Sequence, residues 1–201
     1  MTEITTIVPN TLPTDGPAYP RSLRQRLGKG TPPLTIKGPS EWLNGTDHPV
    51  IALFSSVKAP ARKILQAHEL AQQWRTQPVT IISGFQSPLE EEVWTVLLQD
   101  MVNPFTLLPE QNGPRLVKVL ARSMMQRIAA QERHCITTKS MAFVSPFPET
   151  FKRTTKETAQ VRNRVAAALA DSVLIAHAEE GSSTAHLAQV IQGWDIRLIS
   201  L

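Results

Sequence analysis

The 201-residue chain has a single cysteine, Cys135, which excludes an internal disulfide and any metal site built from several thiolates. Its five histidines show neither the i, i+4 spacing of a helical zinc site nor a cluster of thiolates beside them. The glycine-rich dinucleotide motif, the P-loop and the Gly-x-Ser-x-Gly nucleophile elbow are also missing. We therefore expect no metal and no cofactor, and we assign no catalytic residue.

Long apolar runs are missing as well, because none approaches the roughly 20 residues of a membrane span. The polar first residues lack the cationic and apolar parts of a signal peptide. With 41% hydrophobic and 19% charged residues, the composition is that of an ordinary globular chain. We expect a cytoplasmic protein with no membrane partner, whose net charge of +4 mildly favours polyanions.

Proline is concentrated at the beginning of the chain. Six prolines fall within the first 33 residues, with only a short amphipathic stretch at 22–27 between them. Proline removes backbone donors and interrupts helices, so this composition predicts a Pro-rich N-terminal arm rather than a domain. We expect an arm and lead-in over residues 1–45 and one folded domain over residues 46–201.

From Val50 onward, short apolar runs alternate with longer segments of helical periodicity. Apolar strands separated by helices are typical of a parallel sheet covered on both faces. The pattern therefore predicts an α/β protein with a Rossmann-like, mostly parallel sheet, whose ligand lies outside the carboxyl ends of the strands. The expected strands are 50–54, 79–83, 105–108, 141–144, 172–176 and 196–200, with another apolar segment at 135–138; the expected helices are 63–75, 88–99, 114–133, one around residue 162, and 183–192.

Two loops that follow expected strands have residues suited to phosphate. The loop after the first strand offers Ser55 and Ser56, with the cations Lys58 and Arg62 close behind. Serines before a helix are equally typical of plain N-caps. The loop after the second strand has Ser83 and Gly84, where glycine lets a ligand approach the backbone or simply allows a tight turn. The glutamates at 90–92 are interpreted as dipole-complementing residues on a solvated first helical turn.

The segment 145–164 places aromatic residues among cations. Phe147 and Phe151 are candidates for base stacking, and Lys152 and Arg153 for contacts with backbone phosphates. The alternative is a solvated basic loop whose phenylalanines pack against the body of the protein.

A paired-arginine helix leads through a strand into a turn of small residues. Arg162 and Arg164 lie two positions apart, so on a helix they point roughly 200° apart and one of them should face the crevice. The turn opens another helix, whose free N–H groups and positive dipole end favour an anion. Its residues are Gly181, Ser182, Ser183 and Thr184.

This arrangement resembles the DprA/Smf family of DNA-processing proteins from about Tyr19 to the end of the chain. Arg162-Asn163-Arg164 and the turn at 181–185 resemble the Arg-Asn-Arg helix and the Ser-Gly-x-x-x-Thr-Ala turn of that family, and Ser83-Gly84 resembles the start of its Ser-Gly-x-Ala-x-Gly-Ile-Asp motif. The resemblance implies an extended Rossmann fold that binds single-stranded DNA, commonly forms a homodimer, and helps to load a RecA-type recombinase during natural transformation.

The chain departs from the family pattern at several positions. Ser55-Ser56-Val57 stands where the family has Gly-Ser-Arg, so Lys58 or Arg62 would have to replace the arginine. Pro88-Leu89-Glu90 stands where the family has Gly-Ile-Asp, and we expect a domain without the C-terminal winged helix of the family.

Three functions are consistent with these residues. The first is a DprA-like protein that binds single-stranded DNA or a nucleotide phosphate. The second is a nucleotide-binding or nucleotide-cleaving enzyme, for which Glu90 and Glu180 are the candidate carboxylates. The third is a degenerate family member that acts as a protein-interaction adaptor.

Overall fold

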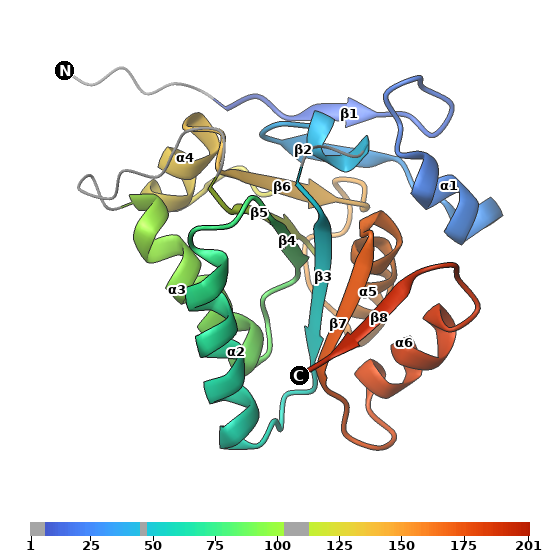
Figure 1. Ribbon diagram of the computed structural model, residues 1–201. Coiled ribbons are helices and arrows are strands. Elements are labelled where there is room, and N and C mark those ends of the chain that lie inside the picture. Colours follow the sequence, from blue (N-terminus) through green and yellow to red (C-terminus); the bar gives the residue numbers. More distant parts are fainter. Residues whose placement is uncertain (1–6, 45–47, 103–112) are drawn as a thin grey trace.

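The computed structural model describes residues 7–44, 48–102 and 113–201 and shows an eight-stranded sheet (Figure 1). The strands are β1 (Asn10–Leu12), β2 (Leu34–Lys37), β3 (Val50–Ser55), β4 (Thr80–Ser83), β5 (Arg115–Val119), β6 (Met141–Ser145), β7 (Ser172–His177) and β8 (Arg197–Ser200). Their order across the sheet is β1-β2-β6-β5-β4-β3-β7-β8. β2 pairs antiparallel with β1 and β6, and the pairings from β6 through to β8 are parallel. The predicted Rossmann-like, mostly parallel sheet is confirmed.

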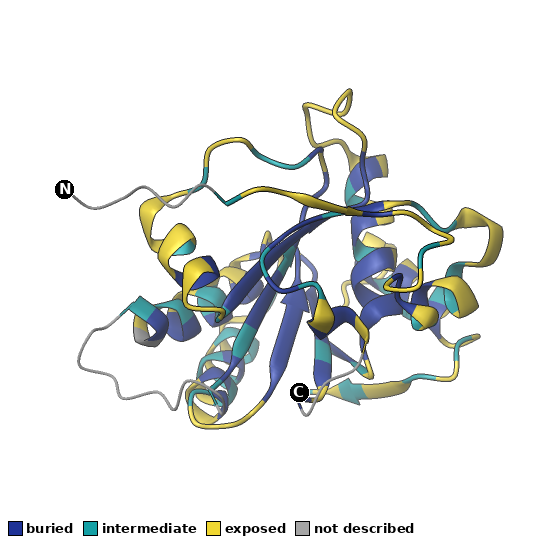
Figure 2. Ribbon diagram, turned by 90° about the horizontal axis from the view of Figure 1, so that it is seen from above, coloured by how far each residue is buried: buried dark blue, intermediate teal, exposed yellow. Residues whose placement is uncertain are grey.

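Helices cover both faces of this sheet, as predicted. They are α1 (Arg21–Leu27), α2 (Ala61–Trp74), α3 (Pro88–Val102), α4 (Ala130–Thr137), α5 (Lys156–Leu169) and α6 (Ser183–Ile191). One apolar core holds α2, α3 and α4 against one face, and another holds α1, α5 and α6 against the other. Figure 2 shows the buried strands between these layers. Among the described helices, none has the length and apolar character needed to span a bilayer.

Local sequence explains the position of α5. The side chain of Thr155 accepts a hydrogen bond from the backbone N–H of Thr158, whose hydroxyl in turn accepts from the N–H of Thr155. Such a capping box stabilises a helix start by about 1 kcal/mol. The small residues 166–168 are fully buried, so the helix backbone lies close to the sheet.

The Pro-rich N-terminal arm is not confirmed. Leu12, Tyr19 and Leu23 are buried, and β2 adds to the sheet by pairing with β6. The prolines stand between these apolar residues, in turns and at an edge of the sheet, where a missing backbone donor is tolerated. The prolines therefore lie in the connections between the elements of a folded N-terminal segment.

The predictions for residues 114–133 and 135–138 are wrong. The structure has strand β5 where a helix was expected over 114–133, because Leu116, Val117 and Val119 are buried between two neighbouring strands. The apolar segment 135–138, expected beside or within a strand, lies mostly in α4. Cys135 is buried there. The predicted strand at 105–108 lies outside the described residues.

Tyr19 allows a direct test of how the N-terminal segment packs, because it is the only tyrosine in the chain. Its hydroxyl donates to the carbonyl of Pro32, and burial raises its pKa from 10.0 to about 12, with Arg24 acting in the opposite direction. The fold favours the neutral phenol, so this stabilisation is present below about pH 10 and is lost as the pH rises through about 12. We predict a phenolate absorbance titration with a midpoint near 12. A midpoint near 10 in folded protein, with unchanged tryptophan fluorescence, would contradict this packing.

Candidate functional site

The candidate site lies where the parallel strands end. The loops after β6, β5, β4, β3 and β7 emerge at the same edge of the sheet, since these strands run in the same direction. The chain proceeds from β3 through β4 and β5 to β6 on one side and then crosses to β7 on the other side of β3. Open α/β sheets bind ligands at such a switch in strand order.

Glu90 connects the loops after β3 and β4. Its Oε1 accepts from the backbone N–H of Ser55 at 3.0 Å. Its Oε2 accepts from the hydroxyl of Ser83 at 3.2 Å and from the N–H of Gln86 at 3.0 Å. The prediction of a solvated first turn is therefore wrong for Glu90, which is only 5% exposed. Its carboxylate fills the place where the sequence predicted that a phosphate would meet Ser55 and Ser83.

Arg162 reaches the same region from α5. Its guanidinium lies against the backbone of Gly84, where a Cβ would come within 1.4 Å of one of its nitrogens. The predicted close approach to Gly84 therefore exists, but it is made by an arginine of the same chain. Gly84 is required there for space and not for an unusual backbone angle.

The Arg162 side chain is a buried cation, only 6% exposed. Burial lowers the pKa of its guanidinium, while the charge of Glu90 raises it. Arginine stays protonated in proteins, so the positive charge remains and must be compensated by nearby negative charge. Its Nε has no hydrogen-bond partner in the part of the chain that the structure describes. Hydrogen bonds within the described chain therefore do not fully satisfy this buried guanidinium.

Arg162 faces a cavity of about 210 Å³, which we call the inner cavity. Gly84, Lys118, Arg122 and Thr154 line it together with Arg162. The Lys118 ammonium lies 3.2 Å from a carboxylate oxygen of Glu132 and 4.4 Å from the ring centre of Trp94. Three cations around a cavity of this size favour an anionic ligand.

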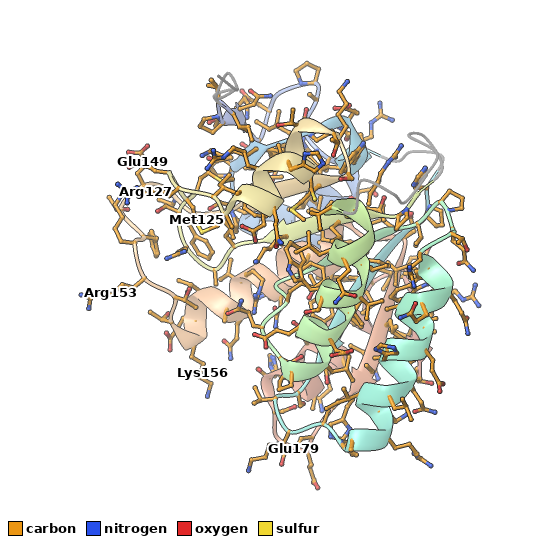
Figure 3. All side chains as sticks on the ribbon, turned by 90° about the vertical axis from the view of Figure 1, so that its left-hand side faces the viewer. Met125, Arg127, Glu149, Arg153, Lys156 and Glu179 are labelled. Carbon is orange, nitrogen blue, oxygen red and sulfur yellow. The ribbon has the colours of Figure 1, made fainter. Side chains whose placement is uncertain are left out.

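A second depression, the outer cavity, adjoins the inner one because Arg122 and Met125 line both. It has a volume of about 450 Å³. Arg127, Glu149 and Lys152 complete its charged lining. Figure 3 shows Arg127, Met125 and Glu149 together at this edge of the molecule.

Sequence analysis missed Lys118, Arg122 and Arg127. On the helix expected over 114–133, Lys118 and Arg122 would share one face and Arg127 would lie on another, whereas β5 and its following loop bring them to the carboxyl edge. The β-branched residues of β5, preceded by Gly113-Pro114, were the signal for a strand.

The turn at 181–184 lies beside the loop after β3, at the switch point (Figure 1). The hydroxyl of Ser56 donates to Oγ of Ser182 at 2.9 Å and accepts from the N–H of Glu179 at 2.9 Å. Oγ of Ser182 also accepts from the N–H of Ala185, which makes it the N-cap of α6. Gly181 has a positive φ of 70°, as its role in the turn requires. The hydroxyls of Ser56 and Ser182 therefore already bond within the protein.

The structure separates the other predicted residues. Arg164 lines a groove between α5 and α6 with Ser183, on another side of α5 from Arg162, which agrees with the predicted divergence of the pair. Lys58 and Arg62 are exposed near the start of α2, and Thr184 is buried. β6 and β7 stand four positions apart in the sheet, which corresponds to about 19 Å at the usual strand spacing.

The loop after β6 places its two aromatic residues differently. Phe147 is buried, whereas Phe151 is 44% exposed and packs on Phe147 with ring centres 5.4 Å apart. Both interpretations of this loop are thus partly right, since one ring anchors it and the other is accessible. Arg153 and Lys156 point away from the body of the protein (Figure 3).

Comparison with solved structures identifies the same architecture in two bacterial proteins. DNA processing protein A from Streptococcus pneumoniae superposes with a TM-score of 0.71 at 16% identity, over 95% of this chain and 62% of that one. DNA processing protein A from Helicobacter pylori gives a TM-score of 0.69 at 18% identity, over 96% of this chain and 80% of that one. The chain thus spans less than two thirds of the Streptococcus protein.

A search of curated protein sequences gave no significant match. The family model for DNA recombination-mediator protein A matches residues 10–194, which is nearly the whole chain. The match includes the arginine helix, the Ser83-Gly84 loop and the turn before α6. The chain therefore belongs to the DNA recombination-mediator protein A family.

Proposed function

We propose that this protein binds single-stranded DNA as a non-enzymatic, DprA-like DNA-processing protein. The observation that carries the proposal is the buried Arg162 guanidinium, held over Gly84 and facing a cavity that Lys118 and Arg122 also line. Fixed cations in a groove at the carboxyl edge of the sheet suit a phosphate backbone. The family match and the single-stranded DNA binding described for the Helicobacter protein support the same ligand.

The DNA phosphates meet the cations of the inner cavity rather than the loop after β3. Glu90 already accepts the N–H of Ser55, and its negative charge repels a phosphate from that loop. The Ser56 and Ser182 hydroxyls are bonded to each other and to backbone N–H groups. The turn at 181–184 is therefore a weaker candidate for phosphate binding than the inner cavity.

The nucleotide-cleaving alternative finds no support in the candidate carboxylates. Both oxygens of Glu90 accept hydrogen bonds within the protein, which suits a structural role better than proton transfer. Glu180 is exposed on the turn after β7, away from the inner cavity.

Three further properties that the family resemblance implies belong to this proposal. They are a homodimer, a RecA-type recombinase as partner in natural transformation, and a cytoplasmic location. The adaptor alternative shares the protein partner but would dispense with DNA binding, so a measurement of DNA affinity separates the two.

The first test is the binding of a short oligothymidylate, followed by fluorescence anisotropy over a range of salt concentrations. We predict an affinity that falls with salt, and we predict that Arg162→Ala decreases the slope of log K against log salt by about 0.7, the value for one phosphate contact on a single strand. Arg162→Lys keeps the charge but loses the planar fork, so it should weaken binding while preserving most of the slope.

Arg197→Ala is the matched control, because it removes an exposed cation from β8 at the far end of the sheet. It should leave affinity and slope almost unchanged. Absence of salt-dependent binding by the unmodified protein would contradict the proposed function.

A second test uses Gly84→Ala, which adds a methyl group where the Arg162 guanidinium lies. We expect the arginine to be displaced, the DNA affinity to fall about five-fold at about 0.1 M salt, and the free energy of unfolding to fall by about 1–3 kcal/mol. Affinity is measured by anisotropy and stability by urea denaturation. Gly30→Ala is the control, since a Cβ at Gly30 meets nothing within 4 Å. If the folded Gly84→Ala protein binds DNA with unchanged affinity, Arg162 is not part of the DNA site.

A further inference from the structure

Cations and a nearby aromatic ring, the two features typical of binding sites for single-stranded DNA, occur together at the outer cavity. Arg122, Arg127 and Lys152 give it three cations, and it adjoins the inner cavity at Arg122. All three side chains are exposed, so a ligand from solvent can reach them directly. Among the described residues that line one or other of the two cavities, five are cationic and only Glu149 is acidic.

An accessible aromatic ring stands on the same loop as Glu149 and Lys152, which line the outer cavity, although the ring is not itself part of that lining. Phe151 immediately precedes Lys152, and its carbonyl accepts from the N–H of Ser123, which lines the outer cavity. This 2.7 Å hydrogen bond fixes the loop after β6 to the loop after β5. The buried Phe147 supports the exposed ring of Phe151 from one side. The ring is thus held in place with part of its surface open to solvent.

We propose that the outer cavity is a second subsite for single-stranded DNA, in which Arg127 and Lys152 bind a backbone phosphate and a base stacks on Phe151. The inference rests on the proposed function and extends it, because Arg122 joins the two cavities and lets one strand continue from Arg162 to Arg127. Sites that bind single-stranded nucleic acid without sequence preference combine base stacking on an aromatic ring with cations that contact the phosphates.

Glu149 allows a test in which DNA affinity should change in the opposite direction. Its carboxylate lines the outer cavity with Arg127 and Lys152 and opposes a phosphate there. Removing this charge should therefore strengthen DNA binding, whereas removing either neighbouring cation should weaken it. A cavity that serves only to hold its own loops together would not produce this pair of opposite effects.

The experiment compares oligothymidylate binding by the full chain and by four variants, Arg127→Ala, Phe151→Leu, Glu149→Gln and the control Arg197→Ala, at about 0.1 M salt. We expect Arg127→Ala to bind about five-fold more weakly, with a salt slope lower by about 0.7. Phe151→Leu keeps an apolar contact with Phe147 but loses the stacking surface, so we expect about ten-fold weaker binding with the slope unchanged. Glu149→Gln should bind more tightly, and Arg197→Ala should match the unmodified protein.

The outcomes distinguish this inference from the function on which it rests. If the unmodified protein and Arg162→Ala differ in affinity but Arg127→Ala and Phe151→Leu bind like the control, DNA stays in the inner cavity and the second subsite is wrong. If the unmodified protein does not bind DNA, both proposals fail. Circular dichroism of each variant verifies the fold, and the exposed positions of Arg127 and Glu149 make their substitution compatible with it.

Discussion

The buried guanidinium of Arg162 holds the carboxyl edge of the sheet together. It reaches from α5 on one face of the sheet and lies against Gly84 after β4. The negative charge of Glu90 stabilises it, and a carboxylate oxygen of Glu90 accepts a hydrogen bond from the loop after β3. A buried cation is costly unless negative charge and hydrogen bonds compensate it, so the position of one group limits the others. Glycine at 84, a carboxylate at 90 and serine at 83 are parts of the same constraint.

This constraint determines where an anion can bind. Glu90 gives the loop after β3 an internal negative group, and the serines at the switch point bond to one another. Arg162 also lines the inner cavity beside β5, where Lys118 and Arg122 add positive charge. In the proposed function, a phosphate therefore meets the cations beside β5 rather than the loop after β3.

Sequence reasoning predicted most of the sheet because β3, β4, β7 and β8 are short apolar runs with clear helical segments between them. It failed at β5, where Pro114 looked like a helix start and tertiary burial between two strands decided the outcome. It placed Arg162 and Gly84 in one site from family motifs. It did not find that they touch, or that Glu90 is buried, because both contacts join segments far apart in the chain.

The account predicts a specific path for the DNA backbone, so a crystal structure with a bound oligothymidylate tests it most directly. We expect phosphate density beside Arg162 and Arg122, continuing toward Arg127, while Glu90 keeps its hydrogen bonds to Ser55 and Gln86. Phosphates bound to the N–H of Ser55 and the hydroxyl of Ser182, with Glu90 displaced and the cavities beside β5 empty, would contradict it.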